Sequence, residues 1–164
     1  MATSDKILLG YGVVSVGAVP IGLTRGGSSF MVEREIRDIE ADGDRGHVKG
    51  RTVIDTENAT LTVNALELFD STKMATYYPA IDITTNLMTS TLSIAVGDHS
   101  DVTWAGKTLD GLAVTITVKD AINMGNIEWS LEDKNEVVPE IAFTATYDEA
   151  TRNTPPWSVL FATV

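Results

Sequence analysis

Cysteine is absent from this 164-residue chain, and histidine occurs only twice. Without thiols the chain can form neither a disulfide framework nor a thiolate metal site, and it has no cysteine nucleophile, which leaves its redox compartment open. Long hydrophobic runs are also missing. The longest, near Val13 to Leu23, is interrupted by Ser15, by glycines and by Pro20. We therefore expect no membrane span, and the amino terminus lacks the basic region of a signal peptide.

Positive charge is scarce. Lysine and arginine total 12 against 23 acidic residues, which gives a net charge of −11. Tight binding of nucleic acid needs a basic footprint, so this balance disfavours DNA or RNA as a ligand. An acidic surface can still enclose nucleic acid without binding it. The content of 43% hydrophobic and 21% charged residues is typical of one globular domain, which we place at residues 1–164.

Apolar and polar residues alternate along much of the chain, a pattern typical of half-buried antiparallel strands. In one such run Phe30 and Val32 alternate with Met31 and Glu33. The alternation predicts a mainly β fold, with strands over about 28–38, 51–67, 83–96, 113–119, 127–132, 140–147 and 157–161.

A single short helix is predicted over residues 71–77. Asp70 is a suitable N-cap, and Phe69 and Met74 have the spacing of a hydrophobic staple. Pro79 disfavours helical geometry at Tyr78 and so ends the helix. Residues 1–27 contain scattered glycines and little alternation, which indicates an amino-terminal arm or loop.

The stretch EADGDRGHVKGR (residues 40–51) contains the densest group of charged residues and glycines. Asp38, Glu40, Asp42 and Asp44 recur at every second position, as in a calcium loop, and Gly43 fits position 6 of an EF-hand. Lys49 stands where the bidentate glutamate should be, and the flanks read as strands, so we predict no metal site. The phosphate-binding motif G-x-x-x-x-G-K-[ST] is also absent.

No catalytic constellation is evident elsewhere, so we expect neither an enzyme nor a cofactor. His47 and His99 have no patterned carboxylate beside them, and Ser28 and Ser29 lack the G-x-S-x-G elbow. Glu33 and Glu35 share one side of a strand, which is more often a solvated face than a carboxylate pair. Of the three tryptophans, Trp129 and Trp157 fall on apolar sides of strands, where packing in the core is expected.

The charge order of the 39–50 loop leaves two interpretations open. Acids alone occupy residues 38–44, whereas Arg45, His47, Lys49 and Arg51 follow with no acid among them. This layout suits head-to-tail contact between copies, in which charge sets register more than affinity. The alternative is a solvated hairpin tip with ion pairs inside the loop.

The runs VPIGLTRGGSSFMVEREIRDIEADGDRGHVKGR (19–51) and LTVNALEL (61–68) resemble the tail tube, or major tail, proteins of long-tailed, non-contractile bacteriophages. The likeness covers about residues 10–78. Beyond them it rests on strand order and on the pieces TATYD (144–148) and PPW (155–157).

The resemblance implies an antiparallel β-sandwich or barrel-like subunit with one short flanking helix and a long hairpin loop. Such subunits form hexameric rings that stack into a hollow tube, where two hairpins per subunit join those of neighbours into an inner barrel. The resemblance also implies that the protein is part of the phage virion and is made in the host cytoplasm. Its implied partners are the tail terminator, tape measure and tail-tip proteins, and no membrane is involved. The loop that reaches the next ring would contain Ile39, Glu40, Asp42, Asp44, Arg45, His47 and Lys49. The arm 1–27 and the last strand would help to join subunits.

The strand pattern also divides the hairpin into two faces. If Phe30, Val32, Leu61 and Val63 face the core, the opposite face consists of Ser29, Met31, Glu33, Glu35, Thr60, Thr62 and Asn64. In a tube this polar face would line the lumen, where an acidic wall repels phosphate and lets DNA slide. A slip of one residue would reverse the assignment. The rival hypothesis is a monomeric β-sandwich module for carbohydrate binding or adhesion, using the loop and Trp104.

Overall fold

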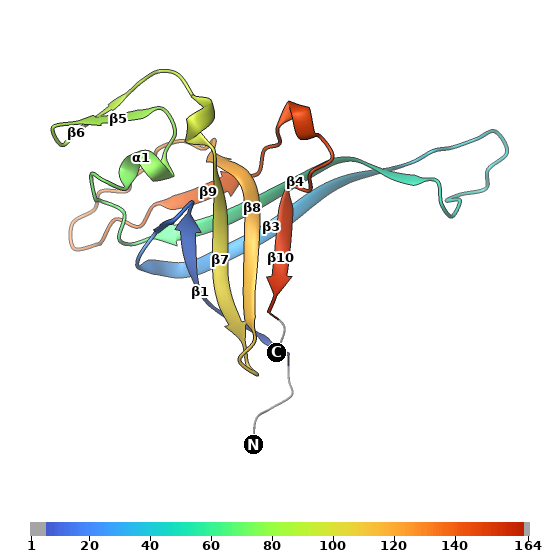
Figure 1. The fold of residues 1–164 in the computed structure, drawn as a ribbon, viewed down its shortest axis with the longest axis horizontal. Coiled ribbons are helices and arrows are strands. Elements are labelled where there is room, and N and C mark those ends of the chain that lie inside the picture. The colour runs from blue at the N-terminus through green and yellow to red at the C-terminus, as the bar shows by residue number, and fades with distance from the viewer. Residues whose placement is uncertain (1–5, 163–164) are drawn as a thin grey trace.

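The computed structural model describes residues 6–162 and consists mainly of antiparallel strands (Figure 1). Two layers pack face to face. The first has the order β2-β1-β7-β8-β10, and the second has β9-β4-β3 joined to it through the end of β8. The strands are β1 Leu8–Val16, β2 Val19–Pro20, β3 Thr24–Asp38, β4 Thr52–Ala65, β7 Ser100–Thr108, β8 Ala113–Asn123, β9 Glu140–Thr144 and β10 Trp157–Phe161.

The core lies between the two layers and follows from the alternation of the strands. Leu61 and Val63 of β4 and Phe143 of β9 face Val102 of β7 and Val118 of β8, and all five are almost fully buried. The predicted strands 28–38, 51–67, 113–119, 140–147 and 157–161 correspond to β3, β4, β8, β9 and β10, with shifts at the ends. The prediction of a mainly β fold is therefore confirmed.

Part of the segment 1–27, predicted as an arm or loop, forms strands. Residues 8–16 form β1, which pairs with β7, and residues 1–5 lie outside the described residues. Glycine conceals the strand pattern for a packing reason. Gly12 lies opposite Gly106, and a Cβ at either position would overlap the indole of Trp104, which lies across both. Strand β7 was not predicted either: its apolar alternation, Val102 and Trp104, is interrupted at Gly106.

Two other predicted strands need correction. Residues 83–96 form a small hairpin, β5 Ile81–Thr84 and β6 Leu87–Ser90, followed by a loop and a 3-10 turn at Val96–Asp98. Its two-residue turn, Thr85–Asn86, has positive φ at both positions, as tight hairpin turns require. Residues 127–132 form no strand, although Ile127, Trp129 and Leu131 alternate with polar residues.

The helix is shorter than predicted. Helix α1 covers Met74–Tyr77, with Lys73 rather than Asp70 at its N-cap. Asp70 instead accepts a hydrogen bond from the Thr72 amide at 2.8 Å, one turn earlier. Phe69 packs edge-on against Trp129, with 4.9 Å between ring centroids. A second 3-10 turn covers Glu149–Thr151, and no helix among the described residues is long and apolar enough to cross a membrane.

Candidate assembly surfaces

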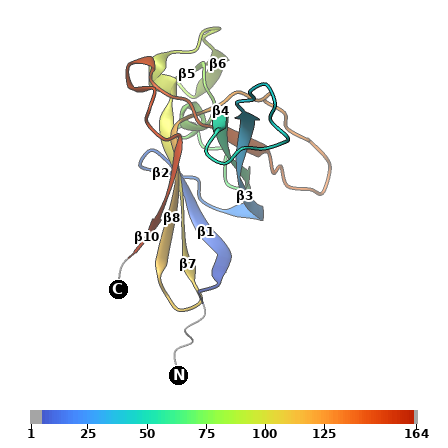
Figure 2. The same cartoon turned by 90° about the vertical axis from the view of Figure 1, so that its right-hand side faces the viewer.

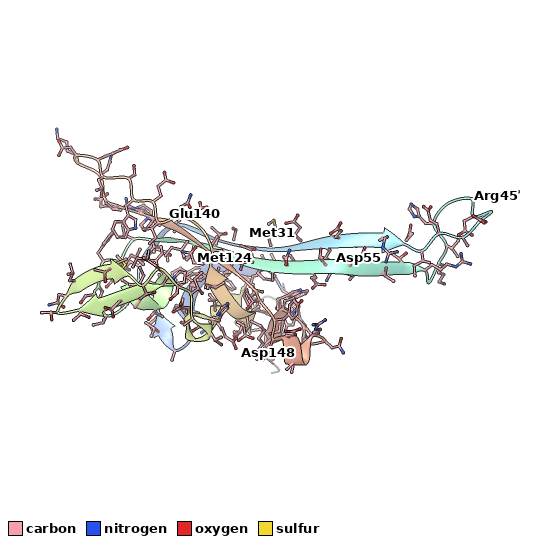
Figure 3. The ribbon with its side chains drawn as sticks, turned by 90° about the horizontal axis from the view of Figure 1, so that it is seen from above. Met31, Arg45, Asp55, Met124, Glu140 and Asp148 are labelled. Atoms are coloured by element: carbon pink, nitrogen blue, oxygen red, sulfur yellow. The ribbon has the colours of Figure 1, made fainter. Side chains whose placement is uncertain are left out.

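The long hairpin β3–β4 extends well beyond the two layers and ends in the 39–50 loop (Figures 1 and 3). We call residues 34–57 the projecting hairpin. Its register shifts between Glu35 and Ile36, so that Asp55 is an extra residue in β4. The Asp55 carboxylate receives two hydrogen bonds from Arg37, at 2.9 and 3.2 Å, and Ile36 and Ile54 lie opposite each other, both more than half exposed. The hairpin is therefore a two-stranded ribbon whose apolar side chains are uncovered.

The charged residue on the apolar side of β3 marks the base of this ribbon. Arg34 lies opposite Glu57 and forms an ion pair with it at 3.4 Å. The Trp157 indole also donates a hydrogen bond to Glu57, while its ring packs against Phe30 at 5.9 Å between centroids. The core thus ends at Arg34.

The 39–50 loop is closed by contacts between its own acidic and basic limbs. Asp38 pairs with His47 and also accepts a hydrogen bond from the Thr52 hydroxyl at 2.8 Å. Asp44 pairs with Arg51 at 2.9 Å and accepts a hydrogen bond from the Ala41 amide at 2.8 Å. The ion pairs expected from a solvated tip are therefore present in the isolated subunit.

The two ion pairs of the loop leave other charges without a partner in the described part of the chain. These are Glu40 and Asp42 on the acidic limb, and Arg45 and Lys49 on the basic limb. The backbone bends at Gly43, Gly46 and Gly50, whose φ values of 92°, 138° and 88° disfavour other residues. The loop accordingly bends at three glycines and presents both signs of charge to solvent.

Hydrogen bonding shifts the titration of the pair at the base of the loop. The hydrogen bond from His47, followed by that from Thr52, lowers the pKa of Asp38 below its ordinary value. The same contact with Asp38 raises the pKa of His47 above its ordinary value. The pair is thus held most firmly where Asp38 is ionised and His47 is protonated.

All seven predicted loop residues, Ile39, Glu40, Asp42, Asp44, Arg45, His47 and Lys49, lie at the tip of the projecting hairpin. Ile39 is half exposed, and its amide donates to the Arg51 carbonyl at 2.8 Å. The structure brings these residues together but keeps them apart from the polar face. Within residues 6–162, no three histidine or acidic side chains gather into a group that could hold a metal ion.

The seven residues of the predicted polar face also share one surface. Ser29 lies opposite Thr62 and Met31 opposite Thr60, on the side of the hairpin away from the core. Leu61 and Val63, one residue out of phase, are fully buried. Met31 and Asp148 lie on opposite sides of the long hairpin (Figure 3). Ser29, Met31, Glu33 and Glu35 are exposed, whereas Thr60, Thr62 and Asn64 are half-buried beside β9.

One surface was missed from the sequence. The lower end of the β1-β7-β8-β10 layer continues past β3, and both ends of the described chain lie there (Figure 2). We call it the ledge: residues 7–12, 105–114 and 159–162. Leu8, Tyr11, Leu160 and Phe161 are between 48% and 86% exposed on it. Trp104, offered above as a ligand-binding residue, is only 7% exposed beneath it. Gly12 and Gly106 interrupt the alternation of β1 and β7, so neither these strands nor the surface that they form was predicted from the sequence.

Comparisons with known proteins support the fold. No family model and no curated protein matches this chain. Among solved structures, eight chains match. One of these comes from the cryo-EM structure of an extracellular contractile injection system, the PVC sheath–tube complex in its extended state. It aligns with a TM-score of 0.59 over 99% of this chain and 95% of that chain, at 15% identity. A likeness at this identity is one of fold.

Proposed function

We propose that this chain is a structural subunit of a phage-type tail tube, a hollow polymer through which genomic DNA passes. The observation that carries the proposal is the division of the long hairpin into a buried apolar face and a continuous polar face. The fold shared with a chain of a sheath–tube complex supports it independently of the sequence resemblance.

In the proposed assembly six subunits form a ring, and rings stack through the projecting hairpin. The polar face lines the lumen, where Glu33 and Glu35 give the wall its acidic character. Arg37, two residues beyond Glu35 in β3, is paired with Asp55. Such a wall repels phosphate, so duplex DNA slides along it without being held. Heterologous contacts of this kind close into a ring about an axis and extend as an open stack along it.

The finer features of the proposal rest on the sequence resemblance. It assigns the tail to the non-contractile class, with tail terminator, tape measure and tail-tip proteins as partners in the virion. The matched solved chain comes from the sheath–tube complex of a contractile system. Both kinds of particle need a tube subunit, so this difference concerns the outer surface and leaves the proposed role unchanged.

The proposal assigns the chain no catalytic role and no cofactor. The rival binding module loses its main support, because the Trp104 indole is buried over Gly12 and Gly106 and is not available to stack on a sugar.

Electron microscopy of the purified protein tests the proposal. We expect rings or tubes with a central channel, whereas a persistent monomer at high concentration would favour the binding module. The loop is tested by reversing charges that have no partner within the subunit, with Asp42→Lys and Lys49→Glu. Each should block stacking and leave folding intact, because neither residue takes part in the two ion pairs of the loop. Asp82→Lys, at an exposed position of β5 with no ion pair in the described chain, is a matched control. Normal stacking of both loop variants would show that the loop is not the ring contact.

A further inference from the structure

The chain contains two Asp-Gly pairs, Asp42–Gly43 between β3 and β4 and Asp110–Gly111 between β7 and β8. An aspartate followed by glycine is especially prone to form a succinimide, because glycine has no Cβ to hinder the attack of its nitrogen on the side-chain carboxyl carbon. The reaction needs an accessible carboxyl group, an amide that is not held in a hydrogen bond and a backbone that can rotate. The two pairs differ in all three respects.

Asp42 and Gly43 form the centre of an exposed turn at the tip of the projecting hairpin (Figure 3). The Asp44 amide donates to the Ala41 carbonyl at 3.1 Å, and Gly43 has φ 92°, as the third residue of a type II turn requires. The Asp44 carboxylate holds the ends of this turn, because it accepts from the Ala41 amide and pairs with Arg51. In the described part of the chain, neither the Asp42 carboxylate nor the Gly43 amide makes a hydrogen bond. The peptide between them can therefore rotate without breaking a contact.

Asp110 and Gly111 are held in place by Thr108. The Thr108 hydroxyl donates to the Asp110 carboxylate, and the Gly111 amide donates to the Thr108 carbonyl at 2.9 Å. Thr108 is only 8% exposed, and its own amide donates to the Leu112 carbonyl at 2.9 Å. Both reacting groups of this pair are thus occupied, and hydrogen bonds must open before they can react. The same dipeptide therefore stands in two different environments within one chain.

At Asp42 the reaction needs only water. The Gly43 nitrogen attacks the carboxyl carbon of protonated Asp42, the nitrogen loses its proton, and the carboxyl hydroxyl leaves as water, which gives a cyclic succinimide. Water then opens the ring at either carbonyl. Attack at the side-chain carbonyl restores aspartate, whereas attack at the main-chain carbonyl gives isoaspartate, whose backbone runs through the side-chain carbons and is longer by one methylene. The water released in the first step equals the water consumed in the second.

We propose that Asp42–Gly43 is a self-modification site, at which unassembled subunits isomerise to isoaspartate while Asp110–Gly111 is protected. The longer backbone cannot keep the turn between Ala41 and Asp44, so a modified subunit has an altered loop tip and no longer stacks. In the polymer, contact with the next ring restrains the same peptide and stops the reaction. The site follows from the subunit alone, whereas its effect on assembly rests on the proposed tube. Aged free subunits would thus be excluded from the growing polymer.

Labelling with heavy-oxygen water tests the site. Hydrolysis of a succinimide places a solvent oxygen in the product, so mass spectrometry of peptides shows which aspartate has reacted, and electron-transfer fragmentation distinguishes isoaspartate from aspartate. In the folded subunit we expect label and isoaspartate at Asp42, at a rate at least about tenfold above that at Asp110, whose hydrogen bonds must first open. In guanidinium chloride both pairs should react alike. Equal rates in the folded subunit, or a difference that persists after unfolding, would overturn the proposal.

Asp42→Glu is the matched variant for the effect on assembly, because it keeps the negative charge and cannot close a succinimide. Its subunits should polymerise after ageing as well as before. Unaltered subunits should lose polymerisation, followed by light scattering, in proportion to the isoaspartate at residue 42, and tubes already formed should take up no label there. If isoaspartate forms at Asp42 and the aged subunits still assemble, the effect on assembly is wrong. If the protein forms no polymer at all, the proposed function fails, and the labelling of the subunit still decides the modification site.

Discussion

The covered and uncovered ends of the same strands differ sharply. In β7 and β8, Val102 and Val118 are fully buried because β4 and β9 lie across them. Farther along the same layer, on the ledge, Leu8 is 48% and Phe161 67% exposed, and no strand of the described chain crosses them. The sequence is comparably apolar at both ends. The two ends differ in whether a second layer of strands covers them. We therefore interpret the subunit as a buried core joined to apolar surfaces that stay exposed until the subunit assembles.

The largest effect is expected at the covered end. Leu61→Ala removes a fully buried side chain from the core, and such changes lower the free energy of unfolding by about 2–5 kcal/mol. Urea denaturation of the isolated subunit measures it. A loss below about 1 kcal/mol would mean that the core relaxes around the cavity, and the contrast with the ledge would weaken.

A smaller loss is expected where the two ends meet. Gly106→Val places a side chain against the Trp104 indole, and overpacking of this kind costs about 1–3 kcal/mol. The indole should also move, which tryptophan fluorescence would detect. Gly97→Val is the control, because a Cβ at Gly97 meets no atom within 4 Å. Equal losses in both variants would rule out a specific role for the glycine beneath Trp104.

A substitution at the uncovered end should change assembly without changing the stability of the subunit. Phe161→Asp alters an exposed residue, so the free energy of unfolding should change by no more than about 1 kcal/mol. Polymerisation, followed by light scattering, should be lost. Leu92→Asp makes the same change at a more exposed site and should polymerise normally. Normal assembly of Phe161→Asp would leave the ledge without a role.

The order of the 39–50 loop should depend on pH, because the loop is held by ionisable side chains and not by a packed core. The folded pKa of Asp38 is lowered, so its contribution is present above its ordinary value of 3.8 and is lost as pH falls through the folded value. The folded pKa of His47 is raised, so its contribution is present below 6.5 and is lost as pH rises through the folded value. The loop should therefore be most ordered between about pH 4 and 6.5.

NMR titration of the His47 ring measures this coupling. The pKa should be above the ordinary value in the unaltered subunit and should fall toward it in Asp38→Asn. An unchanged His47 titration in the variant would show that the pair does not form in solution.

The alternation of apolar and polar residues predicted the strands that have one buried apolar side and one polar side. It failed where glycines occupy positions of the apolar side. Burial of Leu61 and Val63 fixes the phase of β4, so the residues of the predicted polar face lie on the side away from the core. Strands β1 and β7 were missed because Gly12 and Gly106 make room for Trp104. Residues 127–132 have a strand pattern but form no strand in the described chain, where Trp129 packs on Phe69 instead.

The candidate surfaces were predictable to different degrees. Charge order located the loop at the hairpin tip, but it could not decide between contacts within and between copies. The structure places Asp38 with His47 and Asp44 with Arg51, and leaves Asp42 and Lys49 unpaired among residues 6–162. The ledge had no local signal, because its apolar residues come from three distant parts of the chain.

The central claim is that the subunit assembles into a tube whose wall is the polar face of the long hairpin. The most direct test is a cryo-EM reconstruction of the polymer formed by the purified protein. We expect a hollow tube with Met31, Glu33 and Glu35 of every copy on the channel wall and the projecting hairpin in the next ring. A protein that stays monomeric, or a polymer with these residues on its outer surface, would contradict it.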